Sequence, residues 1–133
     1  MFPVNTAEAA TLFLSEFGGG EDSCLCDVNI KTSTWVDGDG SMNFGPLTMS
    51  ASITLQRQSQ ENSGAKILFE RVKNFRINGL DPNGFDGIIQ DLRLRLDASS
   101  TFFSAHDSSH KDAFEYFYVE AERMYWEITN EIG

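Results

Sequence analysis

The spacing of hydrophobic residues changes once, early in the chain. Over residues 6–17, apolar side chains recur at the interval of one helical face, and three glycines follow at 18–20. Asn5 and Glu8 stand at the spacing of a capping box at the start of this segment. The pattern predicts an amphipathic helix over residues 6–17, joined to the rest of the chain by the glycines.

After the glycines, hydrophobic and polar residues alternate, which is typical of strands with one buried face. The clearest alternation runs over residues 48–56, and similar segments cover 24–30, 66–78 and 88–97. The residues expected to face the core are Met49, Ala51, Ile53, Leu55, Leu92, Leu94 and Leu96. Around Val72 the alternation shifts phase, as a β-bulge would cause.

Polar, glycine-rich stretches between these segments predict turns. Turns are expected at 37–46, 58–64 and 79–87, and a long polar connection at 99–112. Residues 114–128 fit two patterns, because aromatic and β-branched residues favour strands while a stripe from Phe114 to Ile128 fits a helix. Strands are the preferred interpretation of this segment, and a helix is the alternative.

Together the segments predict a single domain over residues 1–133 of the α+β class. An N-terminal helix packs on a mainly antiparallel sheet of about five or six strands, because short turns join antiparallel neighbours whereas parallel neighbours need long crossovers. The chain has 11 Phe against three Tyr and two Trp. Phe fills a core without needing a hydrogen-bond partner, so we expect a core rich in Phe.

Charge narrows the range of partners. The net charge is −10 and the isoelectric point about 4.4, so the chain lacks the surplus of cations that nucleic acid or an anionic membrane requires. The N-terminal region is interrupted by polar residues and matches neither a signal peptide nor a membrane span. Cys24 and Cys26, about 6.5–7 Å apart on one face of a strand, are expected to stay reduced. We therefore expect a soluble, cytoplasmic protein.

The negative charge lies at the two ends of the chain. Residues 1–50 carry −6, residues 51–97 carry +1 and residues 98–133 carry −5. If the ends lie together, they form an acidic surface that attracts a basic protein partner or simply keeps the protein in solution. The residues expected to form this binding surface are Glu115, Glu120, Glu122 and Glu127. In a regular strand Glu120 and Glu122 share one face, and the other two share the opposite face.

The motifs of catalysis and metal binding are weak. His106 and His110 have zincin-like spacing, but no helical pattern surrounds them and a third ligand is not apparent. Residues 37–48 resemble a calcium loop only at the start, since Met42 and Thr48 stand where glycine and glutamate are required. Nucleophile-elbow, phosphate-loop and dinucleotide motifs are missing from the sequence. We therefore predict no catalytic residues, no metal and no cofactor.

Residues 67–100, ILFERVKNFRINGLDPNGFDGIIQDLRLRLDASS, combine an apolar-Phe-x-x-Val strand, an Ile-Asn-Gly turn and an Ile-x-Asp-Leu segment before another strand. With Phe17 and Asp22 upstream, this outline resembles immunity proteins of bacterial polymorphic toxin systems and their uncharacterised relatives. The family usually has Phe-His-Asp upstream, where this chain has Glu21-Asp22. The resemblance implies a small protein that neutralises a cognate toxin, and it assigns no site residue.

Two functions are therefore considered. The first is a small, acidic, non-catalytic domain that binds a basic protein, in the manner of an immunity protein. The alternative is a small ligand- or metal-binding domain, or an enzyme, with a pocket lined by aromatic residues. The sequence leaves the oligomeric state open.

Overall fold

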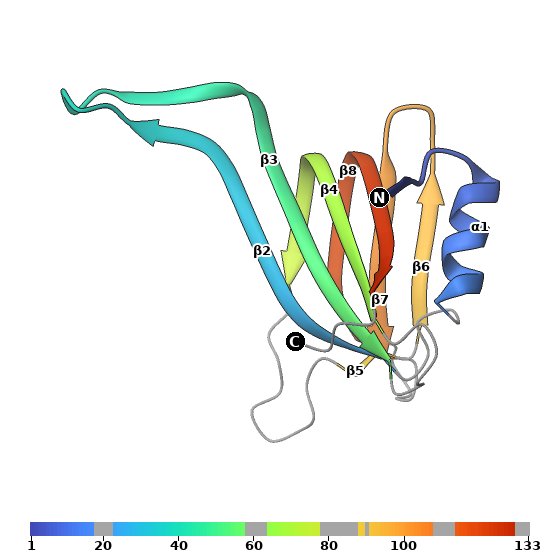
Figure 1. Ribbon diagram of the computed structural model, residues 1–133. Helices are drawn as coiled ribbons and strands as arrows, with labels where there is room; N and C mark the ends of the chain where they lie inside the picture. Colours follow the sequence, from blue (N-terminus) through green and yellow to red (C-terminus); the bar gives the residue numbers. More distant parts are fainter. Residues whose placement is uncertain (18–22, 58–63, 78–87, 90, 108–113, 130–133) are drawn as a thin grey trace.

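The computed structural model describes residues 1–17, 23–57, 64–77, 88–89, 91–107 and 114–129. In chain order its elements are β1 (Phe2–Pro3), α1 (Ala7–Glu16), β2 (Ser23–Val36), β3 (Met42–Arg57), β4 (Gly64–Ile77), β5 (Ile88–Ile89), β6 (Asp91–Leu96), β7 (Thr101–Asp107) and β8 (Phe114–Thr129). All pairs are antiparallel, in the order β5-β2-β3-β4-β8-β7-β6, and β1 pairs with β8 (Figure 1). The α+β class is confirmed, but the described sheet has eight strands where five or six were expected.

The N-terminal helix forms where the sequence predicts it, with a different cap. Thr6, and not Asn5, is the N-cap residue, and its Oγ1 accepts the Ala9 N–H at 3.1 Å. Phe13 is fully buried, and its ring centroid lies 5.1 Å from that of Trp126 on β8. The helix is therefore held against the sheet by aromatic packing.

The predicted core positions of the middle strands are confirmed. Ala51, Ile53 and Leu55 on β3 are at most 2% exposed, and Met49 packs against the core with part of its surface in solvent. On β6, Leu92 is buried, and the other two leucines named above are partly buried against the same core. Alternation along a strand therefore identifies the buried face correctly.

The predicted phase shift near Val72 marks a sharp bend in two strands. Burial passes from Phe69 to Val72 in β4 and from Ala121 to Met124 in β8, and each step skips two residues instead of one. Arg71 lies inside the irregularity with φ 54°, a left-handed conformation that is unusual for a residue with a side chain. In Figure 1 both strands arch over at this point, so each strand contributes to two opposed halves of the sheet.

The core lies between these two halves and is rich in Phe, as expected. Phe69, from the first half of β4, has its ring centroid 5.4 Å from Phe103 on β7 and 6.5 Å from Phe117 on β8. Phe75, beyond the bend, contacts Phe117 edge-on at 5.3 Å. The bend thus lets one sheet enclose its own core, and α1 lies beside β6 at its margin (Figure 1).

The structure settles one open alternative from the sequence and corrects two predictions. Residues 114–128 form a strand, so the helical alternative is wrong. The polar connection expected at 99–112 contains β7, because Thr101, Phe103 and Ala105 alternate as buried residues. The segment at 88–97 is two strands at opposite ends of the sheet, since β5 pairs with β2 and β6 pairs with β7. The turns expected at 58–64 and 79–87, and the glycines at 18–20, lie largely outside the described residues.

Beyond the body of the sheet, β2 and β3 continue together as a projecting hairpin (Figure 1). Residues 33–48, which we call the arm, pair only within this hairpin among the described residues. Thr32 pairs with Met49 and Thr34 with Phe44, so one residue of β2 lies opposite four residues of β3. Pro46 falls in this bulge, where a residue without an N–H disturbs the ladder least. The turn predicted at 37–46 is accordingly shorter, because β3 begins at Met42.

Candidate functional site

The acidic residues expected to bind a partner lie on β8. Glu120 and Glu127 are half-buried and Glu122 is exposed. The phase shift in β8 places Glu120 and Glu127 on the same side of the sheet, away from the core, so the expected division into two faces is wrong. The backbone of Glu115 lies opposite His106 on β7, and its side chain is outside the described residues.

Ion pairs join β4 to β8 at the bend. Arg71 Nε is 2.9 Å from Glu122 Oε2, and Arg123 Nε is 3.3 Å from Glu70 Oε1. We call these four residues the bend quartet. All four side chains are well exposed to solvent, so each pair contributes about 0–1 kcal/mol.

The other described carboxylates of β8 also have polar neighbours. Lys73 Nζ donates to Ser100 Oγ at 2.7 Å, and Ser100 Oγ donates to Glu120 Oε2 at 3.3 Å. Glu127 is the ladder partner of Lys66 on β4. The described part of the predicted acidic surface is therefore a mixed-charge surface.

A cavity of about 590 Å³ lies between the N-terminal segment, the β6–β7 turn and the bend of β8. Its walls include Asp97, Ser99, Glu122, Arg123 and Tyr125. Tyr125 is the aromatic residue among the described residues that line it, whereas Phe13, Phe69, Phe103 and Phe117 are fully buried in the core and Phe75 is partly buried against it. The cavity is lined by a mixture of charged, polar and aliphatic residues, unlike the aromatic-lined pocket of the alternative hypothesis.

His106 belongs to β7 and not to a loop. It is 8% exposed, and its Nε2 lies 2.8 Å from Ser104 Oγ on the same strand. Asp91 lies across the ladder from His106, but its Oδ2 is bound to Arg93 Nε at 2.7 Å. His110 lies outside the described residues, and within the described part no group of three or more His, Cys, Asp or Glu is arranged to hold a metal ion.

The two cysteine thiols lie close together at the start of β2. Cys24 Sγ and Cys26 Sγ are 3.5 Å apart as free thiols, because the register of β2 shifts between Leu25 and Asp27. Cys26 Sγ also lies 3.2 Å from Gln56 Oε1. Partial burial of the sulfur, and then the neighbouring Cys24 thiol, raise the pKa of Cys26 to about 11, so the sulfur stays protonated at neutral pH.

The turn of the arm is held by the carboxylate of Asp37. Its oxygens accept hydrogen bonds from Trp35 Nε1 at 3.1 Å and Asn43 Nδ2 at 2.7 Å, one from each strand. The backbone closes the turn through Asp37 N to Ser41 O and Gly40 N to Asp37 O, at 2.8 and 2.9 Å. Gly40 adopts φ 87°, which glycine accepts without strain. The turn is therefore a defined structure with a fixed indole beside it.

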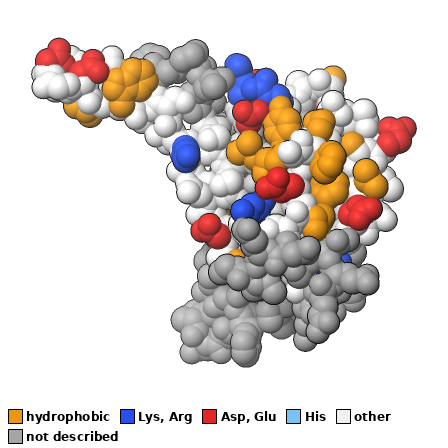
Figure 2. Space-filling model, viewed as in Figure 1, with side chains coloured by type: hydrophobic (Ala, Val, Ile, Leu, Met, Phe, Trp, Pro, Cys, Tyr) orange, Lys and Arg blue, Asp and Glu red, His pale blue; other side chains and the backbone are white. Residues whose placement is uncertain are grey.

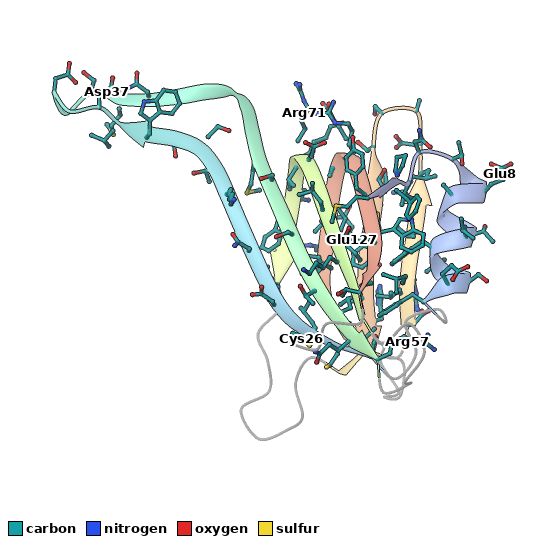
Figure 3. The ribbon with its side chains drawn as sticks, viewed as in Figure 1. Glu8, Cys26, Asp37, Arg57, Arg71 and Glu127 are labelled. Atoms are coloured by element: carbon teal, nitrogen blue, oxygen red, sulfur yellow. The ribbon has the colours of Figure 1, made fainter. Side chains whose placement is uncertain are left out.

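The arm tip, residues 35–43, exposes large apolar side chains next to acidic ones. Trp35 is 51% exposed, Val36 65% and Met42 87%. The Ser41 N–H donates to Asp39 Oδ1 at 2.9 Å and lowers the pKa of that carboxyl, so Asp39 is ionised at neutral pH. Figures 2 and 3 show acidic and apolar side chains together at this far end of the molecule. Trp and Met are enriched at protein interfaces, and the tip exposes one of each beside the carboxylates of Asp37 and Asp39.

Besides the polar turn itself, the sequence contains a second signal for the arm tip. Trp35, Val36 and Met42 flank the polar turn without continuing the alternation of buried positions. A turn flanked on both sides by large apolar residues, far from the nearest core position, indicates a hairpin that projects from the domain.

Comparison of the chain with protein-family models, curated proteins and solved structures finds no match. The one described helix is too short and too polar to cross a membrane.

Proposed function

We propose that this chain is a small, acidic, non-catalytic protein-binding domain that captures a basic partner through its arm. The observation that carries the proposal is the arm tip, where Trp35, Val36 and Met42 are exposed around the acidic turn of Asp37 and Asp39. Isolated exposed apolar residues are common on protein surfaces, but here three of them surround one projecting, hydrogen-bonded hairpin: Val36 and Met42 are cross-strand partners on one face, and Trp35 lies on the other.

Charge supports the same partner class. With a net charge of −10, the molecule attracts cationic proteins over distances near the Debye length. The carboxylates of Asp37 and Asp39 lie at the far end of the arm, where a partner can approach them. Attraction of this kind raises the association rate, whereas the apolar side chains slow dissociation. Because the chain resembles immunity proteins, the partner we propose is a toxin. Neutralising a toxin in this way fits a location in the cytoplasm.

The test measures binding of the arm to the protein encoded next to this chain, because the resemblance implies an adjacent toxin gene. Replacing Trp35 and Met42 with Ala should weaken binding by roughly thirtyfold or more, since loss of one buried interface Trp costs about 2 kcal/mol or more. Leu12→Ala is the matched control, because Leu12 is 54% exposed on α1, away from the arm. Biolayer interferometry gives both rates. Equal affinity of the double variant and the wild type would overturn the proposal.

The β8 carboxylates require a separate variant. Reversing Glu120 and Glu122 to Lys should slow association at low ionic strength if the tail also steers the partner, with dissociation less affected. Circular dichroism checks that the variant is folded. An unchanged association rate would assign these charges to solubility and leave the arm as the binding element.

A further inference from the structure

The outer edge of β2 is a long, exposed strand edge. One edge of β2 pairs with β3. Along the other edge, among the described strands, β5 pairs with Ser23 and Cys24, and the remaining residues of β2 have no partner strand. Residues 29–32 are all exposed. Such an edge presents backbone N–H and C=O groups that can extend the sheet with another strand.

The regular part of this edge lies between two register shifts, at residues 27–32. Val28 and Ile30 pair with the buried Ile53 and Ala51 of β3, so they are on the core side of the sheet. Asp27, Asn29 and Lys31 pair with Thr54, Ser52 and Ser50, so they are on the other side. The edge thus has two apolar residues on one face and two opposite charges on the other.

This arrangement is complementary to itself under a two-fold rotation. Two copies of β2 placed edge to edge and antiparallel, with the axis through Asn29, bring Asp27 opposite Lys31 of the second copy, and the reverse. The same register brings Ile30, 40% exposed, opposite Val28 of the second copy. Moving the axis by one residue in either direction leaves neither charge opposite its counterpart.

We infer that β2 forms a homodimer by antiparallel pairing about Asn29, with a second copy of this chain as its occupant. The ladder runs over residues 27–31, and β5 ends it near Cys24. Each chain carries −10, but this segment is locally neutral, and physiological salt screens the long-range repulsion. The arm tips lie outside the ladder, so pairing does not depend on the function proposed for the arm.

The test is a charge-reversal cycle followed by sedimentation equilibrium from 5 to 500 μM in 150 mM NaCl. The wild type should pass from 14.9 kDa to twice that mass as concentration rises. Asp27→Lys places Lys against Lys, and Lys31→Asp places Asp against Asp, so each variant alone should associate at least tenfold more weakly. The double variant restores both pairs and should dimerise like the wild type. Glu8→Lys on α1 is the control for net charge, and it should not weaken association.

Mixing the two single variants gives the sharpest result. Each should associate weakly alone, but the Asp27→Lys chain and the Lys31→Asp chain have opposite charges at both contacts and should form a heterodimer. A wild type that stays monomeric throughout the range would overturn the inference. Single reversals without effect, or a double variant that does not recover, would also overturn it, because both exclude this register.

Discussion

At the scale of single residues, Arg71 shows how local strain serves the fold. A left-handed conformation costs a residue with a Cβ about 1–2 kcal/mol, yet Arg71 adopts φ 54° at the bend of β4. Its side chain meets Glu122 of β8, and the neighbouring Val72 is 5% exposed in the core. The strain is tolerated because the bend lets Phe69 and Val72, on either side of it, both reach the core.

Substitutions at this position should reverse the usual preference for β-branched residues in strands. Arg71→Gly should stay within about 1 kcal/mol of the wild type, because relief of strain offsets the lost ion pair. Arg71→Val should be at least about 1 kcal/mol less stable than Arg71→Gly, since a β-branched residue tolerates positive φ poorly. At Lys66, a regular and exposed position of β4, Val should instead be the better of the two. Urea denaturation measures all four variants, and the same ranking at both positions would contradict this account of the bend.

At the scale of elements, neighbouring residues of β3 differ in which side of the sheet they face. Ile53 is 2% exposed within the core, whereas Thr54 is half-buried on the other side. Ile53→Ala should cost about 2–5 kcal/mol through lost burial and the remaining cavity. Thr54→Ala should cost about 0.5 kcal/mol or less. Chemical denaturation compares them directly, and similar small losses would mean that the register of β3 is misassigned.

Strands with uninterrupted alternation were predictable from the sequence, and the elements missed had weaker patterns. β7 looks polar because Ser104 and His106 alternate with residues as small as Ala105, and only Phe103 marks its buried face strongly. Its neighbour Phe102 lies on the opposite side, with the Arg95 guanidinium 3.9 Å from its ring centroid. β1 has two residues and exists through its pairing with β8. Such elements depend on tertiary contacts, which a local pattern does not contain.

At the scale of the whole molecule, strand pairing determines what the charges do. The sequence shows a neutral middle and acidic ends, but it does not show that β4 pairs with β8 and so brings Arg71 and Lys73 near the tail. That pairing joins residues about fifty positions apart and converts part of the expected acidic surface into a mixed one. The arm tip lies outside this pairing, so its acidic residues remain at the far end of the molecule, beside exposed apolar side chains.

The pKa shifts of Asp97 and Cys26 predict that the free energy of unfolding falls at both ends of the pH range, which we call the acid limb and the alkaline limb. Asp97 accepts the N–H groups of Ser99 and Ser100, each at 2.9 Å, and the first of these hydrogen bonds is the main cause of its lowered pKa. A carboxyl with a lowered pKa stabilises the fold above its unfolded value near 3.8, and this contribution is lost as the pH falls through the folded value. Cys26 has the opposite sign, because its raised pKa favours the fold below the unfolded value of 9.0, and this contribution is lost as the pH rises towards 11.

Two variants separate these limbs. Asp97→Asn should lower stability at pH 7, and its difference from the wild type should shrink below pH 4, where the wild-type carboxyl is protonated and its charge-assisted hydrogen bonds weaken. Cys26→Ser should leave the acid limb unchanged and reduce the loss of stability between pH 9 and 11, because the unfolded chain no longer gains by ionising this thiol. Thermal unfolding followed by circular dichroism from pH 2.5 to 11 measures both effects in one buffer series. If Cys26→Ser and the wild type lose stability in parallel above pH 9, the thiol contact at the start of β2 does not control the alkaline limb.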